Sequence, residues 1–285
     1  MIEMIQQRLR GYGAANAVEE ENATKEIIQE IALYGLWRAD FFDVALFQGG
    51  TSLRILHGLP RFSEDLDFLL RAPDPEFRWD RYLATLVDVF AQFGIKLEAS
   101  PRDRMDKAVR EAVLKNDSIA SQLDLEFADS RRARTIRIKL EIDTNPPAGS
   151  GEEGTFLDFP ADHEVRHQDL ASNFALKIHA LLCRPYLKGR DWFDFSWYVA
   201  KDTAPNLAHL EAALVQAGPW QGEALRLDAA WLQDKLTARI ASIDWRHAAS
   251  DVRRFLRPAE VKSLDLWSER FFLAKLEKMM KVLDQ

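Results

Sequence analysis

The sequence predicts an α+β fold in which a palm-like domain with a mixed β-sheet precedes a helical domain. Three observations support this prediction. Short strand-like and helix-like segments alternate in the first half of the chain. Residues 145–151 are rich in proline and glycine, which marks a domain boundary. From residue 169 onward, apolar residues recur at helical spacing. The expected parts are an N-terminal helical segment packing on the palm at 1–40, the palm at 41–147 and the helical domain at 148–285.

The composition is that of a globular chain with a sizeable core. The 285 residues, of which 47% are hydrophobic, suit two modest domains or one large one. A net charge of −7 argues against a surface coated with nucleic-acid-binding charge, although it permits a local basic groove. The single cysteine, Cys183, excludes an internal disulfide framework and is interpreted as a small core residue. Because no signal-like segment or membrane-spanning apolar run is evident, we expect a cytoplasmic protein.

The N-terminal segment is expected to be helical. Apolar residues from Ile27 to Leu36 follow a helical stripe that would pack on the palm. The acidic run Glu19–Glu21 before this stripe is interpreted as a solvated turn.

A strand, a glycine turn and a helix follow this segment. The apolar run Phe42–Phe47 has the length of a strand and stops before Gly49 and Gly50, where the backbone can turn sharply and approach a ligand. Thr51 or Ser52 is expected to cap the next helix, whose N-terminal NH groups and dipole favour an anion. The pattern therefore predicts a phosphate-binding turn.

The next segment carries two carboxylates on alternate residues. Strand alternation over residues 61–70 places Ser63, Asp65 and Asp67 on one face. Two carboxylates held this close repel each other, and Mg²⁺ with bridging phosphate oxygens is the usual compensation, with Mn²⁺ as an alternative. An Asp-x-Asp pair alone is a weak signal, and a calcium loop is excluded because its glycine and distal glutamate are missing. Together with the glycine turn, the pair predicts a metal and phosphate site.

A third carboxylate is expected on a later strand, because a two-metal site commonly needs one more acid to share the ions. Residues 135–144 alternate as a strand does, and Glu141 is the first candidate. Asp143 lies on the same face, and Asp124 and Glu126 lie on a neighbouring predicted strand. These three residues remain alternatives to Glu141.

The other elements follow from periodicity and from chain breakers. A helix is expected over residues 75–93, ended by Gly94, and a strand over residues 95–99. The charged residues 101–118 are interpreted as a helix or an excursion. Further strands are expected at 121–127 and 135–144, and helices at 170–183, 192–200, 207–215, 225–243, 248–256 and 264–283.

These motifs resemble the nucleotidyltransferase superfamily and, within it, the AbiEii/AbiGii toxin family. The resemblance is carried by Gly-Gly-Thr-Ser-Leu at residues 49–53, Arg-Phe-Ser-Glu-Asp-Leu-Asp at 61–67 and Leu-Glu-Ile-Asp at 140–143. The stretches 176–184 and 188–194 are similar to the C-terminal motifs of that family. The resemblance therefore implies a nucleotidyltransferase-like palm and extends over residues 40–200.

The resemblance also implies roles for residues beyond the palm. Lys177 lies on an otherwise apolar helix, where a buried ammonium is costly unless it finds an anion. The resemblance implies that Lys177 binds a triphosphate, with Asp191 or Arg190 completing the pocket, while a snorkelling surface lysine is the plainer alternative. The aromatic residues from Trp192 to Tyr198 are interpreted first as core.

The predicted site residues fall into three groups. They are Asp65, Asp67, Glu141, Lys177 and Asp191 for catalysis; Gly49, Gly50, Thr51, Ser63, Lys177 and Arg190 for nucleotide binding; and Asp65, Asp67 and Glu141 for the metal. Two basic clusters are weaker candidates for substrate contact, because runs of charge are usually solvated surface. Their members are Arg131, Arg132, Arg134, Arg137 and Lys139 in the first cluster, and Arg184, Lys188 and Arg190 in the second.

The expected activity is Mg²⁺-dependent transfer of a nucleoside monophosphate from an NTP to an acceptor hydroxyl, with release of pyrophosphate. The resemblance implies a toxin of a bacterial toxin–antitoxin or phage-defence pair that acts on an RNA such as tRNA and is neutralised by an antitoxin. Two alternatives remain. One is a catalytically silent module that binds a partner, and the other is a metal-dependent phosphohydrolase that uses water as the acceptor.

Overall fold

The chain divides into two compact units, each of which is described by itself. The computed structural model describes residues 1–285 except 103–107, 117–122, 124, 126, 128–134 and 285. The sheet unit comprises Met1–Gly58, Phe62–Pro146 and Gly154–His167, and the helical unit comprises Leu59–Arg61, Pro147–Glu153 and Gln168–Gln285. These units do not coincide with a single boundary after residue 147. Residues 154–167 belong to the sheet unit, and Leu59–Arg61 and Pro147 belong to the helical unit.

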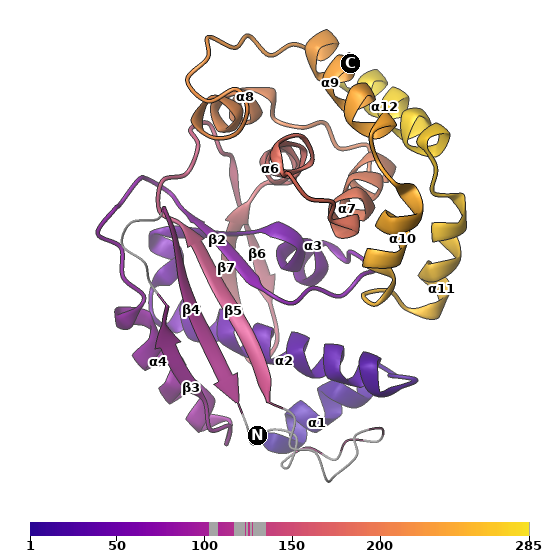
Figure 1. Ribbon diagram of the computed structural model, residues 1–285. Coiled ribbons are helices and arrows are strands. Elements are labelled where there is room, and N and C mark those ends of the chain that lie inside the picture. Colours follow the sequence, from indigo (N-terminus) through magenta and orange to yellow (C-terminus); the bar gives the residue numbers. More distant parts are fainter. Residues whose placement is uncertain (103–107, 117–122, 124, 126, 128–134, 285) are drawn as a thin grey trace. The chain divides into compact units, whose positions relative to one another are not determined.

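The described elements confirm an α+β fold with a helical C-terminal part (Figure 1). Those of the N-terminal part are α1 (Ile2–Gly11), α2 (Ala17–Arg38), η1 (Phe41–Asp43), β1 (Ala45–Gln48), α3 (Gly49–His57), β2 (Leu66–Leu70), α4 (Asp80–Gln92), β3 (Glu98–Pro101), β4 (Val109–Asn116), β5 (Ile136–Asp143), β6 (Glu152–Leu157) and β7 (His163–Gln168). Those that follow are α6 (Leu170–Cys183), α7 (Gly189–Ala200), α8 (Leu207–Gln216), α9 (Ala229–Ala241), α10 (Trp245–Arg253), α11 (Pro258–Val261), η2 (Lys262–Leu266) and α12 (Glu269–Leu283).

The strands form one mixed sheet in the order β3-β4-β5-β2-β1-β7-β6. β2 pairs with β5 and β1 pairs with β7 in parallel, whereas the β1–β2, β3–β4 and β4–β5 pairs are antiparallel. Two of these strands, β6 and β7, lie where the sequence predicts the start of the helical domain. β6 is one of the two edge strands and most of its residues are exposed, so it lacks the apolar alternation that identifies a strand in a sequence.

The two faces of the sheet differ in polarity. Helices α2 and α4 pack against each other, and α2 packs on β5 (Figure 1). The strand residues in the same core are Ala45, Phe47, Leu66, Phe68, Leu70, Ala112, Leu114, Ile136, Ile138, Leu140, Ile142 and Val165. Because successive side chains of a strand point to opposite faces, the residues between these belong to the other face. That second face carries the acidic residues of β2, β4 and β5.

Several predicted elements are corrected by the structure. The acidic run Glu19–Glu21 is not a solvated turn, because α2 already begins at Ala17, where the Asn16 side chain accepts hydrogen bonds from two backbone NH groups. Residues 109–116, interpreted as a helix or an excursion, form strand β4. Its residues alternate between buried and partly exposed, as the pairing with β5 requires. Most of the strand expected at residues 121–127 lies outside the described residues.

A buried polar group joins the first helices of the sheet unit. Arg8 on α1 forms a salt bridge with Glu30 on α2. The Tyr12 hydroxyl donates to Glu26 at 3.0 Å, and the Arg54 Nε donates to Glu26 at 2.9 Å. Burial raises the pKa of Glu30 to about 7, although its contacts with Arg8 act in the opposite direction.

The raised pKa of Glu30 predicts a pH-dependent stability. A carboxyl group with a higher pKa in the folded chain favours folding below its ordinary value of 4.5, and this contribution is lost as the pH rises to about 7. The loss amounts to about 3 kcal/mol of unfolding free energy. Urea denaturation at a series of pH values should therefore show a fall between pH 4.5 and 7 that is absent from Glu30→Gln.

Glu277→Gln is the control for this experiment. Glu277 is an exposed residue of α12 whose pKa is lowered by its hydrogen bond to Lys281, so its titration has the opposite sign. This variant should keep the fall seen in the wild-type chain. The assignment to Glu30 is wrong if Glu30→Gln and Glu277→Gln show the same pH profile.

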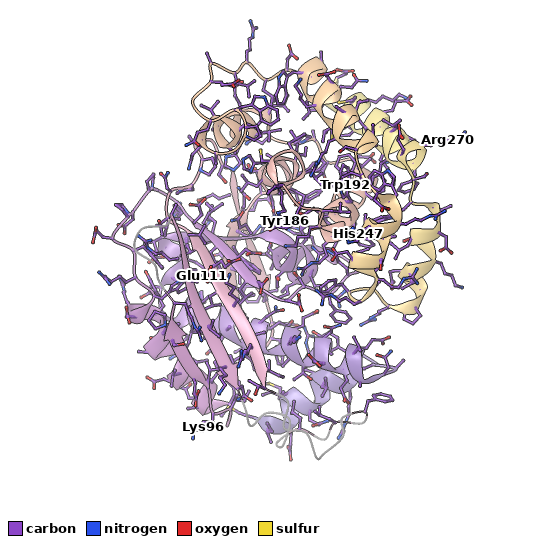
Figure 2. The ribbon with its side chains drawn as sticks, in the orientation of Figure 1. Lys96, Glu111, Tyr186, Trp192, His247 and Arg270 are labelled. Atoms are coloured by element: carbon purple, nitrogen blue, oxygen red, sulfur yellow. The ribbon has the colours of Figure 1, made fainter. Side chains whose placement is uncertain are left out.

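The helical unit has an aromatic core of its own. Trp192 on α7 is buried, and its ring contacts those of Trp245 and Phe272 at centroid distances of 5.0 and 5.3 Å (Figure 2). Phe193, Phe195 and Tyr198 are also buried, which confirms the core interpretation for these rings, whereas Trp197 is partly exposed. Burial raises the pKa of the Cys183 thiol to about 11, so this half-buried cysteine is not a reactive thiolate. Within the described part of the chain, no helix has the length and apolar character needed to cross a membrane.

Candidate functional site

A row of polar residues crosses the second face of the sheet. Gln48 on β1 is the register partner of Asp67 on β2, Asp67 is the partner of Glu141 on β5, and Glu141 is the partner of Glu111 on β4. Neighbouring strands lie about 4.8 Å apart, so register partners on one face are direct neighbours. The structure therefore brings together the predicted Asp67 and Glu141 and adds Glu111, which the sequence analysis did not identify.

The glycine turn lies directly against Asp67. Gly49, the first residue of α3, has a φ of +78°, a conformation that favours glycine. A Cβ atom at this position would lie 2.6 Å from the Asp67 Oδ2 and 3.0 Å from its Cβ. A side chain at residue 49 is therefore excluded by its backbone conformation and by the neighbouring carboxylate. This contact places the N-terminus of α3, whose dipole favours anions, beside the acidic row.

The hydroxyl groups near the turn have structural partners. Thr51 and Ser52 lie inside α3 rather than at its cap, which is Gln48, so the capping prediction is wrong. The buried Thr51 hydroxyl donates to the backbone carbonyl of Asp65, and the Ser52 hydroxyl donates to the carbonyl of Gly49 at 2.9 Å. Thr51 thus holds the segment that leads into β2, and its role in nucleotide binding stays a prediction.

Asp65 and Ser63 precede the strand that carries Asp67. The predicted alternation over residues 61–70 is correct only from Leu66 onward, where β2 begins. The backbone carbonyl of Ser63 accepts a hydrogen bond from Gln29 at 3.2 Å, and that of Asp65 accepts one from Thr51. These backbone contacts, rather than strand pairing, position the first two residues of the Ser-x-Asp-x-Asp motif.

Lys139 connects the two glutamates of the acidic row. Its ammonium lies 2.5 Å from a Glu141 carboxylate oxygen and 2.9 Å from a Glu111 carboxylate oxygen. Burial alone would lower the pKa of Lys139, but its hydrogen bonds and charge interactions with both glutamates raise it above the ordinary value. This lysine of the first basic cluster therefore contacts acidic side chains of its own sheet.

Among the alternatives for the third acid, the register favours Glu141. Asp143 lies one step further along the same face, opposite Leu69, and its carboxylate accepts a hydrogen bond from the Asn145 NH at 2.9 Å. Burial raises the pKa of Asp143. Asp124 and Glu126 lie outside the described residues, as do Arg131, Arg132 and Arg134 of the first basic cluster.

The donor chemistry of the row suits a hard divalent cation. Asp67 and Glu141 present carboxylate oxygens from neighbouring strands, and such oxygens are the ligands that Mg²⁺ prefers. With the side chains in their present positions, no group of three or more potential ligands among the described residues comes close enough to hold a metal ion. Glu141 is paired with Lys139, so metal binding by Glu141 requires this lysine to give way. The metal assignment of Asp65, Asp67 and Glu141 stays a prediction.

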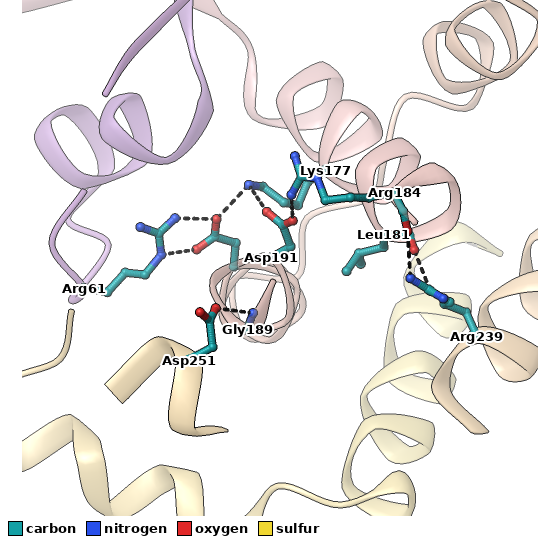
Figure 3. Close-up of polar contacts among 9 residues, drawn as sticks. Arg61, Lys177, Leu181, Arg184, Gly189, Asp191, Arg239 and Asp251 are labelled. Atoms are coloured by element: carbon teal, nitrogen blue, oxygen red, sulfur yellow. Dashed lines mark hydrogen bonds and ion pairs between the residues drawn. The ribbon is translucent and has the colours of Figure 1, made fainter. Parts of the chain in front are cut away.

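A second group of charged residues lies in the helical unit, and we call it the helical cluster. Its members alternate in sign in the order Arg61, Asp194, Lys177, Asp191 and Arg184 (Figure 3). Arg61 donates from Nε and from a terminal nitrogen to the two Asp194 oxygens, both at 2.6 Å. The Lys177 ammonium lies 2.9 Å from an oxygen of Asp194 and 2.9 Å from an oxygen of Asp191, which also contacts Arg184.

The charges of the helical cluster stabilise one another. Burial alone would raise the pKa values of Asp191 and Asp194, but the neighbouring cations hold both below the ordinary value. Burial would likewise lower the pKa of Lys177, whereas the two aspartates raise it. The side chain of Lys177 is 13% exposed, so a snorkelling surface lysine is excluded. Lys177 and Asp191, both predicted site residues, are in direct contact.

The second basic cluster is divided between two environments. Arg184 belongs to the helical cluster, whereas the Arg190 guanidinium stacks on the Phe255 ring, 4.2 Å from its centroid. Burial, together with neighbouring cations, lowers the pKa of Lys188 although Asp191 acts in the opposite direction. A role of Arg190 in nucleotide binding stays a prediction.

Arg61 and Asp194 are members of the cluster that the sequence analysis missed. Arg61 is the first residue of the Arg-x-Ser-x-Asp-x-Asp stretch, and Asp194 lies three residues after Asp191 on α7. The spacing of Asp191 and Asp194 indicates that both belong to one group, because helical residues three apart share a face. No local pattern indicates the contact between Arg61 and Asp194, which are 133 residues apart in the sequence.

The glycine turn at the N-terminus of α3 and the acidic row lie together on one mixed sheet. The family model described as "Nucleotidyl transferase AbiEii toxin, Type IV TA system" matches residues 31–275. The chain therefore belongs to the AbiEii nucleotidyltransferase toxin family of type IV toxin–antitoxin systems. Membership implies an antitoxin as a partner.

Solved structures that match the chain include two from Helicobacter pylori. One is a crystal structure described as a nucleotidyltransferase candidate, with 18% sequence identity, a TM-score of 0.49 and coverage of 90% of this chain and 91% of that chain. Another is JHP933, with 16% identity, a TM-score of 0.48 and coverage of 93% and 91%. Among curated proteins, none matches the chain.

Proposed function

We propose that this chain is a Mg²⁺-dependent nucleotidyltransferase that transfers a nucleoside monophosphate from an NTP to an RNA acceptor such as tRNA, within a phage-defence system. The contact of Gly49 with Asp67, beside Glu141 on the next strand, carries the proposal. It combines a helix N-terminus suited to phosphate with carboxylates suited to a divalent cation. Family membership supports the transferase class.

The residues of the sheet unit have distinct roles in this proposal. Asp65, Asp67 and Glu141 would hold Mg²⁺, with Mn²⁺ as an alternative. When bound, the metal would neutralise phosphate oxygens and lower the pKa of an attacking hydroxyl. Gly49 and Gly50 let the backbone of α3 approach a phosphate, and Thr51 fixes the backbone of Asp65. The acceptor hydroxyl loses its proton and bonds to the α-phosphorus, while the bond to the pyrophosphate group breaks.

The helical cluster supplies the proposed contacts to the triphosphate. Lys177 is a buried ammonium whose position is fixed by Asp191 and Asp194. A charge-assisted hydrogen bond from such a group to phosphate contributes about 1.5–3 kcal/mol. In this proposal, Asp191 orients the Lys177 ammonium.

A labelling experiment tests the proposed reaction. The protein is incubated with each NTP labelled at the α-phosphate, Mg²⁺ and total bacterial RNA, and the RNA is then separated and counted. We expect label in RNA with an α-labelled NTP and none when the same NTP carries the label at its γ-phosphate. Asp67→Asn serves as the inactive control.

The same experiment separates the alternatives. A labelled free monophosphate that forms without RNA would indicate a phosphohydrolase. If no NTP is consumed and no product is labelled under any condition, the proposal is wrong and a binding module is favoured. Label in the protein fraction instead of RNA would overturn the acceptor assignment alone.

A further inference from the structure

The helical cluster contains more positive than negative charge. Its three cations, Arg61, Lys177 and Arg184, face the two carboxylates Asp191 and Asp194, so positive charge is in excess (Figure 3). The neighbouring Lys188 also acts on Asp191 and adds to this excess. Arg61 and Asp194 are 2% and 0% exposed, so water screens this interaction little. The size of the positive excess around Lys177 therefore depends on these cations.

Lys177 alone would not make the cluster attractive to an anion. It contacts two carboxylates, and a lysine between two carboxylates has a net charge of −1. Such a group repels phosphate. The fork of Arg61, which bonds both oxygens of Asp194, and the contact of Arg184 with Asp191 reverse that sign.

We propose that Arg61 is a positioning residue for nucleotide binding, acting through Asp194 to keep the environment of Lys177 net positive. The inference rests on the proposed function, in which Lys177 binds the triphosphate. Arg61 itself need not touch the nucleotide. It neutralises Asp194, which in turn holds the Lys177 ammonium in place without cancelling its charge.

Charge-restoring variants of the full chain test this role, with inorganic triphosphate as the probe and calorimetric titration as the measurement. Arg61→Gln removes one positive charge from the cluster, and we expect binding about tenfold weaker, because one buried charge has been lost. Adding Asp194→Asn restores the original net charge. The double variant should bind within about threefold of the wild-type chain, because the net charge around Lys177 is restored.

If the role of Arg61 is purely structural, the double variant should bind triphosphate more weakly than Arg61→Gln. The double variant removes both members of the ion pair, so damage to the fold should weaken binding further rather than restore it. Asp194→Asn alone is not decisive, because it leaves the buried Arg61 without its carboxylate and removes one contact of Lys177. If Arg61→Gln does not fold, the folded double variant still decides the question, because binding more than about tenfold weaker than that of the wild-type chain overturns the inference.

Lys278→Gln is the matched control for the loss of one positive charge. Lys278 forms an exposed ion pair with Asp202 in the same unit, 2.8 Å apart, and its replacement should leave triphosphate binding unchanged. Lys177→Ala should lose binding. If the wild-type chain and Lys177→Ala bind triphosphate equally, the proposed role of Lys177 fails. If Lys177→Ala loses binding but Arg61→Gln does not, only the inference about Arg61 is wrong.

Discussion

Replacing Asp67 by asparagine is expected to abolish nucleotidyl transfer while leaving the sheet unit folded. Asp67 is the register neighbour of Glu141 and lies against the glycine turn, so its carboxylate joins the acidic row to the N-terminus of α3. Removing a metal ligand there should cost about 4 kcal/mol of transition-state stabilisation, or about 10³-fold in kcat. Glu141→Gln should cause a similar loss.

The folding stability of Asp67→Asn, unlike its activity, should stay the same or increase slightly. Like charges on directly opposite strand residues are destabilising by about 0.2–1 kcal/mol, so Asp67→Asn should unfold at the same or a slightly higher temperature. A second measurement does not depend on turnover. Added Mg²⁺ should raise the unfolding temperature of the wild-type chain and leave that of Asp67→Asn unchanged.

Asp143→Asn is the control for these acidic variants. Asp143 lies on the same face of β5 but opposite Leu69, away from the row. Its replacement should lower kcat by less than about tenfold. If Asp143→Asn is inactive while Glu141→Gln retains activity, the third acid is Asp143. Near wild-type turnover by Asp67→Asn would overturn the metal assignment.

Gly49→Ala is expected to lose both stability and activity. At a φ of +78° an alanine costs about 1–2 kcal/mol. Its Cβ would lie 2.6 Å from Asp67 Oδ2, so the Asp67 side chain must move away. A displacement of about 1 Å in a catalytic group can lower the rate about 10²-fold, and this loss should appear in kcat.

Gly94→Ala separates the effect on the backbone from the effect on the site. Gly94 follows α4 with the same φ of +78°, and a Cβ there would meet no atom within 4 Å. Urea denaturation should show a loss of stability in both variants, larger in Gly49→Ala because of its added contact with Asp67, whereas initial rates should fall only in Gly49→Ala. Equal activity of the two variants would contradict the contact between residue 49 and Asp67.

Much of the fold could be predicted from the sequence because its signals are local. Helix α6 has the predicted bounds, Leu170 to Cys183. Gly94, the predicted end of the preceding helix, follows α4 and has a positive φ. β5 alternates between buried and partly exposed residues as its sequence does. In each case the periodicity of the side chains or the freedom of glycine determines the conformation within a few residues.

Other features of the fold and of the site depend on which segments, far apart in the sequence, pair with each other. Glu111 belongs to the acidic row only because β4 is antiparallel to β5 in one particular register, and a shift of one residue would turn it to the opposite face. The exposed edge strand β6 has no apolar alternation, so nothing in its sequence identifies it as part of the sheet.

The sequence alone determined the glycine turn, the Asp-x-Asp motif and the acidic strand, because each is a short pattern with a local physical cause. Only the tertiary structure decided that Asp67 and Glu141 are neighbours and that Asp194 bonds Arg61 as well as Lys177. Strand register and buried ion pairs are set by the packing of segments far apart in the chain. Local periodicity carries no information about these long-range contacts.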